Sequence, residues 1–233
     1  SYQQIKGELK DSSFNICIQK GTPRIKRYFE GRTLNLAQGA SGHNNYAHWL
    51  FDMLPKIKLY QEKFDLKDLS SIYVNKLNQF QELSFKLLNL ESLKIIDSNK
   101  FRHIQSDEVI AVQHPNYFKG YIMKEHQKLP EWIINWLRES FIQKAQKISA
   151  VEKIFIDRSQ SKFNHCQIIN YDETIEFLVS SGFKILKLEE LTFVEQISLF
   201  NQSKIIVGAH GAGFANLSFC NPGTKIIEIR PAN

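Results

Sequence analysis

The chain has 233 residues, of which 42% are hydrophobic and 12% aromatic. These values are typical of globular proteins and exclude wholesale disorder. No run approaches the roughly 18 consecutive apolar residues that a membrane span needs, and the first residues lack the charged-then-apolar pattern of a signal sequence. The net charge of +6 favours an anionic partner such as a nucleotide or a phospholipid surface.

The basic residues and the cysteines indicate which binding partners and which cellular compartment to expect. We interpret the densest basic cluster as a solvated face, with a contact to lipid head groups or phosphate as the alternative. Its members are Lys20, Arg24, Lys26, Arg27 and Arg32. No RNA-type aromatic motif or finger spacing accompanies it, so we expect no nucleic-acid partner. The three cysteines, Cys17, Cys166 and Cys220, form no C-x-x-C pair, which disfavours a zinc site and favours a reducing compartment.

We therefore expect a cytoplasmic protein that lies at most peripherally on the inner face of a membrane. The chain begins without methionine, and it stops directly after an apolar run that a helix usually follows. A longer parent protein that carries an anchor is left open by this pattern.

The first half of the chain mixes strands and helices irregularly. The apolar patterns predict strands over 14–18, 33–36, 71–75, 93–97 and 108–112, and helices over 44–63, 80–90 and 130–147. The last of these helices opens at Pro130, where a missing N–H costs least. Its apolar side holds Trp132, Ile133, Trp136 and Leu137, which we interpret as packing residues.

From Val151 the alternation becomes strict. Strands over 153–157, 183–188 and 204–207 alternate with predicted helices over 172–181 and 192–201. Gly182 is expected to end the first of these helices, and Thr192 with Glu195 fits a capping box at the start of the second. Strands that alternate with helices of about 10–15 residues imply a parallel sheet, so the predicted fold class is α/β. We place two domains, at 1–125 and 151–233, with a connecting helix in 126–150.

A glycine-rich turn follows the strand that starts at residue 204. Three glycines fall within 208–213, a helix-compatible stretch follows, and a second apolar run carries Glu228. The N–H groups of such turns bind anions, most often a nucleotide phosphate. The alternative is that the glycines only allow close packing and that His210 is an ordinary turn residue. The spacing matches neither G-x-G-x-x-G nor the P-loop pattern.

The predicted helix over 44–63 carries two stripes. Tyr46, Leu50, Met53 and Ile57 form an apolar stripe. Asn45, His48 and Asp52 form a separate polar stripe. His48 and Asp52 are four residues apart, so the carboxylate can orient the imidazole, and such a pair is a candidate general base. The alternative is an N-capping asparagine followed by an exposed helical pair.

Four ordered blocks of the sequence resemble glycosyltransferase family 61. They are N-x-x-H-W-L-x-D-x-L-P from residue 45, F-I-D-R-S from 155, N-Y-D-E from 170 together with E-Q-I from 195, and H-G-A-G-x-x-N…P-G-x-x-I-x-E-x-x-P from 210. The resemblance spans about residues 40–231. The family includes plant xylosyl- and arabinosyltransferases, animal O-linked N-acetylglucosaminyltransferases and many bacterial polysaccharide enzymes, and we place this chain with the bacterial group.

The resemblance implies a GT-B-like fold, in which two Rossmann-like domains face each other across a cleft. It further implies an inverting transferase that moves a sugar from a nucleotide sugar, UDP-linked, to a glycan or lipid-linked glycan in surface polysaccharide synthesis. The donor would be its only small-molecule requirement, with no further cofactor. No Asp-x-Asp motif is present in the sequence, so we expect a metal-independent reaction.

The resemblance also implies roles for particular residues. His48 and Asp52 are expected to be catalytic, and either could be the base. The residues expected to hold the donor are Asn45, Arg158, Asn170, His210, Gly211, Ala212, Gly213, Asn216 and Glu228. Among them, Arg158 and the backbone amides of 211–213, with a helix dipole, would meet the diphosphate, and Glu228 would accept from a ribose hydroxyl.

The chain departs from the family pattern at one point. The family usually carries a second basic residue shortly before the asparagine matched by Asn170, whereas this chain has N-H-C-Q over 164–167, so Lys162 or His165 would have to substitute.

Two other functions were weighed. A catalytically inactive relative that only binds a nucleotide or glycan is the alternative, and the presence of His48, Asp52 and Arg158 argues against it. A Rossmann oxidoreductase or epimerase would need G-x-G-x-x-G after an early strand, and the sequence has none.

Overall fold

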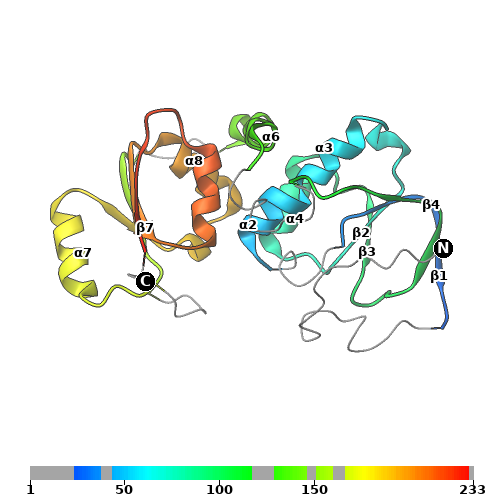
Figure 1. Ribbon diagram of the computed structural model, residues 1–233, viewed down its shortest axis with the longest axis horizontal. Helices are drawn as coiled ribbons and strands as arrows, with labels where there is room; N and C mark the ends of the chain where they lie inside the picture. Colours follow the sequence, from blue (N-terminus) through cyan, green and yellow to red (C-terminus); the bar gives the residue numbers. More distant parts are fainter. Residues whose placement is uncertain (1–23, 38–43, 117–128, 146–150, 160–165, 231–233) are drawn as a thin grey trace.

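The computed structural model describes residues 24–37, 44–116, 129–145, 151–159 and 166–230, and all structural statements below concern these residues. They form two four-stranded parallel sheets, each flanked by helices. Figure 1 shows the strands of the first half in one lobe and those of the second half in the other. The α/β class with parallel sheets is therefore confirmed. The predicted strand over 14–18 lies outside the described residues.

The first sheet has the order β3-β2-β1-β4. Its strands are β1 (Arg27–Asn35), β2 (Ser71–Val74), β3 (Lys94–Asp97) and β4 (Ile104–Ala111), and its helices include α3 (Pro55–Gln61) and α4 (Gln79–Leu87). The chain adds β2 and β3 on one side of β1 and then crosses to its other side to add β4. In open α/β sheets, ligands bind beyond the carboxyl ends of the two strands where the order reverses, which are here β1 and β4.

The second sheet has the order β6-β5-β7-β8. Its strands are β5 (Lys153–Ile156), β6 (Lys184–Leu186), β7 (Ile205–Ala209) and β8 (Lys225–Ile229), and its helices are α7 (Tyr171–Ser180) and α8 (Phe193–Gln202). The order reverses between β5 and β7. The strict alternation that the sequence shows after Val151 thus produces the expected parallel sheet.

The sequence signals predicted for the end of α7 and the start of α8 are confirmed. Gly182 follows α7 with a positive φ of 82°, a backbone conformation that glycine adopts without strain. Thr192 and Glu195 form a reciprocal capping box at the start of α8. Two strands were predicted too short: β1 begins at Arg27 rather than at residue 33, and β4 begins at Ile104 rather than at residue 108, because the two strands pair with each other from Arg27 and Ile104 onward.

The predicted helix over 44–63 is interrupted by a π turn. α2 (Tyr46–His48) leads into the π segment η2 (Trp49–Met53), in which the Leu54 N–H donates to the Trp49 carbonyl, and α3 then starts at Pro55. A proline inside a regular helix has no N–H to donate, and its ring clashes with the carbonyl four residues earlier. The wider turn directly before Pro55 accommodates it. The predicted apolar stripe is retained, because Leu50, Met53 and Ile57 are buried.

The stretch after the glycine turn is a 3-10 helix, η6 (Ala212–Phe219), where the sequence indicated an ordinary helix. Side chains within it bond backbone carbonyls three residues earlier. The Asn216 amide donates to the Gly213 carbonyl, and the Ser218 hydroxyl donates to that of Ala215. These bonds fit the tighter i to i+3 spacing and compete with the α-helical pattern. The expected α-helix dipole at this turn is thus replaced by the weaker end of a 3-10 helix.

One hydrophobic core runs through both halves of the chain. It includes Leu34 and Ile72 of the first sheet and Ile154 and Ile206 of the second. Between them lies α6 (Glu131–Phe141), which contacts both α3 and η6 (Figure 1). Its apolar side, which includes Ile133, Trp136 and Leu137, is buried as predicted.

A polar contact also joins the halves. The Tyr46 hydroxyl on α2 donates to the Asn216 side-chain oxygen on η6, with an O···O distance of 2.6 Å. Asn216 is fully buried, and its amide nitrogen donates to the Gln196 side chain on α8. Burial raises the pKa of Tyr46, so the phenol stays a neutral donor. Every group of the Asn216 side chain is therefore paired inside the protein.

We expect Tyr46→Phe to destabilise the fold by about 1–3 kcal/mol, because it leaves a buried Asn216 oxygen without its donor. Urea unfolding of the two proteins measures this loss. Tyr28→Phe is the matched control, since its hydroxyl bonds the exposed Asp107 carboxylate and is itself exposed. Equal losses in the two variants would contradict a special role for the Tyr46–Asn216 bond.

Candidate active site

Three ionisable side chains meet at the carboxyl ends of β1 and β4. His48 Nδ1 lies 2.5 Å from Asp52 Oδ2, so the predicted i, i+4 pair is formed. His114, which follows β4, places its Nε2 3.5 Å from the other carboxylate oxygen of Asp52. His48 ends α2, which is the next described helix after β1, and His114 follows β4, so the cluster belongs to the two strands between which the order of the first sheet reverses.

The Asp52 side chain at the centre of this cluster is only 12% exposed. Burial alone would raise its pKa, but the contacts with His114 and His48 outweigh burial and lower the pKa to about 2. One helical turn later, Lys56 is also buried, and burial lowers its pKa while the Asp52 charge partly opposes this. Asp52 is thus an anion throughout the neutral range.

Sequence reasoning did not identify His114. The predicted strand ended at residue 112, and the rule that ligands bind beyond the carboxyl ends of strands could have drawn attention to a histidine two residues later.

A second group of residues meets at the carboxyl ends of β5 and β7. Arg158 follows β5, and its guanidinium donates to the carbonyl of His210, which follows β7. A Cβ built on Gly211 would overlap the Arg158 guanidinium, so the arginine lies flat against this glycine. The extended backbone of Gly211 is open to any residue, and the absence of a side chain there is needed for this contact.

The glycine turn is connected to β8 through Glu228. His210 Nδ1 lies 2.6 Å from one oxygen of the Glu228 carboxylate, and Arg230 Nε lies 2.6 Å from the other. Burial would raise the pKa of Glu228, but these two partners lower it. The carboxylate expected to meet a ribose therefore already accepts from two side chains at the surface.

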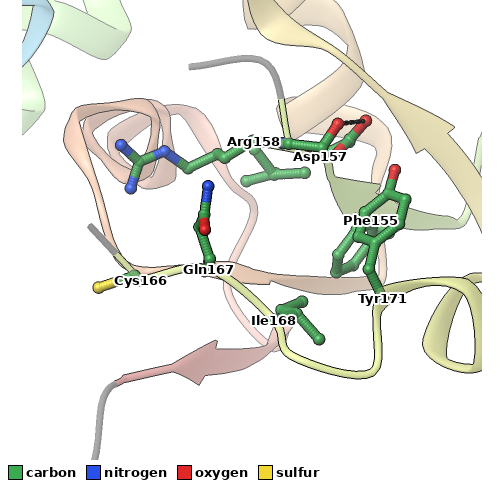
Figure 2. Close-up of a pocket in the computed structure, with 10 residues that line it drawn as sticks. Phe155, Asp157, Arg158, Cys166, Gln167, Ile168 and Tyr171 are labelled. Atoms are coloured by element: carbon green, nitrogen blue, oxygen red, sulfur yellow. Dashed lines mark hydrogen bonds between the residues drawn. The ribbon is translucent and has the colours of Figure 1, made fainter. Parts of the chain in front are cut away.

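A hollow of about 220 Å³ opens between β5, β7 and α7, beside Arg158 (Figure 2). It is lined by Phe155, Ile156, Asp157, Arg158, Ser159, Cys166, Gln167, Ile168, Tyr171 and Ala209. In the view of Figure 2, the Arg158 guanidinium lies at one end and Phe155 and Tyr171 at the other, with Gln167 and Ile168 along one side. A mostly apolar wall with a few polar groups and one cation suits a planar ring attached to an anionic group.

Asp157 fixes the turn that carries Arg158. Its carboxylate accepts from the backbone N–H of Ser159 at 2.8 Å and from the Ser159 hydroxyl at 3.0 Å, and Asp157 is buried. Hydrogen bonds of this kind define an Asx turn. The sequence singled out Arg158, whereas Asp157 and the pocket residues Gln167 and Tyr171 were not identified.

Several predicted donor residues have structural partners. Asn45 caps α2 by accepting from the N–H groups of Ala47 and His48, which was the alternative interpretation of this residue. Asn170 is exposed at the start of α7 and donates to Glu173. Asn216 is fully buried, so its side chain faces the interior and the expected direct contact with a ligand does not fit its position.

The remaining predicted residues belong to the glycine turn or lie outside the described residues. A Cβ on Gly213 would lie 2.7 Å from Leu188 Cδ1, so this glycine permits close packing, and Ala212 begins η6 beside it. Lys162 and His165, the expected substitutes for a missing basic residue, are outside the described ranges.

Three further expectations concern the charged cluster, metals and membranes. Arg24, Lys26 and Arg27 are exposed, whereas Arg32 pairs with Glu108 and Asp68. Over the described ranges, no three His, Cys, Asp or Glu side chains are grouped so that they could hold a metal ion. In the same part of the chain, no helix has the length and apolar character needed to cross a bilayer.

Comparison with models of protein families identifies the family of this chain. The family model described as Glycosyltransferase 61 matches residues 46–227. The chain belongs to glycosyltransferase family 61. The matched region contains the His48–Asp52 pair, Arg158 and the glycine turn, so the family assignment made from the four sequence blocks is confirmed. No curated protein matches the sequence significantly.

Among solved structures, this chain is similar to the dodecameric iron-containing heptosyltransferase TibC in complex with ADP-D-β-D-heptose. The TM-score is 0.43 and the identity 13%, over 88% of this chain and 60% of that chain. A second structure, of TibC from enterotoxigenic E. coli H10407, gives a TM-score of 0.42 and 13% identity over 88% and 59% of the two chains. The chain therefore spans about three fifths of the length of these structures.

The low pKa of Asp52 should make the stability of the fold depend on pH in the acid range. The pKa is lower in the folded state, so the stabilisation is complete above the ordinary carboxyl pKa and is lost as the pH falls through about 2. We expect Asp52 to account for about 2 kcal/mol of the unfolding free energy lost between about pH 5 and pH 2.

Urea unfolding at a series of pH values measures this dependence. Asp52→Asn should flatten the acid limb of the stability curve. Glu176→Gln, which removes an exposed carboxylate on α7, is the control and should leave the limb steep. A wild-type curve that is no steeper than that of Asp52→Asn would contradict the pairing described above.

Proposed function

We propose that this chain carries the catalytic centre of an inverting, metal-independent glycosyltransferase with a nucleotide-sugar donor. The observation that carries the proposal is that both candidate sites lie where the strand order of a sheet reverses, and that one hydrogen bond, Tyr46 to Asn216, joins their supporting elements. The His–Asp–His cluster offers a base, and the Arg158 turn offers a cation for a diphosphate. An enzyme that activates a hydroxyl and releases a nucleotide needs both.

The proposal includes a GT-B-like arrangement, with the two Rossmann-like units, 1–125 and 151–233, on opposite sides of the substrates. Support comes from the two parallel sheets and from the contact of α2 with η6, which brings the element that carries His48 to the glycine turn. The donor would lie on the second unit and the acceptor hydroxyl near the first.

On the donor side, the hollow beside Arg158 would hold the base of the nucleotide, and the guanidinium would meet the diphosphate. An arginine offers several N–H donors in a planar fork, which suits phosphate oxygens. We propose a UDP-linked sugar as the donor. The side chains of His210 and Glu228 lie at the edge of this site and would contact the ribose.

On the acceptor side, we propose His48 as the general base. Its Nδ1 faces the Asp52 carboxylate, so the neutral ring carries its proton on Nδ1 and its lone pair on Nε2. Asp52 itself, with a pKa of about 2, is a weak proton acceptor near neutral pH. The acceptor would be a glycan or lipid-linked glycan of a surface polysaccharide, and the exposed Arg24, Lys26 and Arg27 could face the anionic membrane that carries such a lipid.

Arg158→Ala tests the donor side. We expect UDP or a UDP-sugar to bind about 1.5–3 kcal/mol more weakly, the range for a hydrogen bond to a charged group. Isothermal titration calorimetry with UDP, GDP and CMP measures the affinity and the base preference. Lys184→Ala removes an exposed cation at the opposite end of the same sheet and serves as the control. Unchanged affinity in a folded Arg158→Ala protein would discard the assignment.

His48→Asn and Asp52→Asn test the base. Asn at 48 can still donate to Asp52 but lacks the distal ring nitrogen, so turnover should fall about 10²–10⁴-fold with donor affinity nearly intact. Both proteins are assayed with EDTA present, where the wild-type rate should be maintained. If only Asp52→Asn loses turnover, the carboxylate is the base. Nucleotide binding without turnover in the wild type would favour the inactive relative instead.

A further inference from the structure

The carboxylate of Asp52 is shared between two imidazoles that come from different parts of the chain. His48 faces Oδ2 from the preceding helical turn, and His114 faces Oδ1 from the segment after β4. The two rings therefore lie against opposite oxygens of one carboxylate. Only the His48 pair is a local helical contact, whereas the His114 contact exists because β4 lies beside β1 in the sheet.

A backbone hydrogen bond fixes the tautomer of His114. The N–H of Asn116 donates to His114 Nδ1 at 3.2 Å. A nitrogen that accepts a hydrogen bond carries no proton, so the proton of the neutral ring must be on Nε2, the atom that faces Asp52. His114 can therefore donate to the carboxylate as a neutral group, and protonation of its ring would break the bond from Asn116.

We infer that His114 is a positioning residue, a neutral Nε2–H donor that holds the Asp52 carboxylate in the plane where it orients His48. Only His48 then changes its charge when a proton is taken from the acceptor. This inference rests on the proposed function in one respect, namely that His48 is the base; the hydrogen-bond arrangement itself does not depend on it.

A second group that donates to the Asp52 carboxylate would limit the rotation of this carboxylate. A carboxylate held on one side can rotate about its Cβ–Cγ bond, and the His48 ring would follow it. Among the described residues, the charged and titratable groups facing this carboxylate are His48 before η2, Lys56 of α3 and His114 after β4. Among them, His114 approaches Oδ1 from the sheet side. Its distance of 3.5 Å is long for a direct hydrogen bond, and catalytic hydrogen bonds often shorten only when substrate is bound.

The test uses two amides of similar size at position 114. The side-chain nitrogen of glutamine can take the place of Nε2 and still donate to Asp52, whereas that of asparagine corresponds to Nδ1 and falls short. We expect His114→Asn and His114→Ala to lower kcat roughly 10- to 100-fold, the range for groups that orient a functional imidazole, with little change in donor KM. His114→Gln should retain most of kcat. Thermal melts of the three variants identify any general loss of folding.

The pH dependence of kcat separates positioning from mere packing. When the His114 donor is lost, more negative charge on Asp52 is left to stabilise a protonated His48. The acid limb of the profile should therefore move to higher pH in His114→Asn, and it should stay in place in His114→Gln. A limb that does not move in His114→Asn, or glutamine and asparagine variants of equal activity, would overturn the inference.

A measurement on the wild-type protein needs no activity. With ¹⁵N-labelled histidine, the ring nitrogen shifts report the tautomer, and the His114 signals are those missing from His114→Gln. We expect the signals of the neutral tautomer that carries its proton on Nε2. A charged ring, or a proton on Nδ1, would overturn the inference even if the protein is an active transferase. If the expected tautomer is present but the wild type has no turnover, the proposed function fails and the donor arrangement of His114 stands.

Discussion

The arrangement of both sites depends on one buried amide. Asn216 has no contact with water, so each of its polar atoms must find a partner inside the protein. Its oxygen accepts from Tyr46 in the first half of the chain, and its nitrogen donates to Gln196 and to the Gly213 carbonyl in the second. A shift of α2 against the glycine turn would leave at least one of these groups unpaired. The amide thereby sets the distance between the helix that carries His48 and the turn that faces Arg158, and its role in the fold explains its place in the sequence pattern better than ligand contact does.

The two sheets of the chain have the same strand topology. In each sheet the order reverses next to the first strand, and in each case the chain beyond the two diverging strands carries polar, paired side chains. His48 and His114 follow β1 and β4, and Arg158 and His210 follow β5 and β7. The two sites nevertheless differ in charge. The first centres on a buried anion with a pKa of about 2, whereas the second presents a cation to solvent, which is consistent with activation of a hydroxyl at one site and retention of an anion at the other.

Features encoded by near neighbours in the chain could be predicted from the sequence. The His48–Asp52 pair follows from helical spacing, the capping box from Thr192 and Glu195, and the parallel sheet from regular alternation after residue 151. Features that depend on tertiary neighbours could not be predicted. His114 reaches Asp52 only because β4 pairs with β1, and Asn216 is buried only because α2 and α8 pack around η6. The π turn and the 3-10 helix were missed for a related reason, since apolar periodicity does not distinguish helix types and Pro55 and the side-chain bonds of η6 decide them. The roles assigned to the site residues remain predictions.

The π turn over 49–53 has a consequence for how this family member can vary in sequence. A π turn contains one residue more than the α-helical turn it replaces, so deletion of one residue would leave a regular helix with Pro55 inside it, where its ring clashes with the carbonyl four residues earlier. Within this segment only Phe51 is not buried. The length of the segment cannot change, and insertions or deletions among homologous chains should be confined to the connections on either side of it.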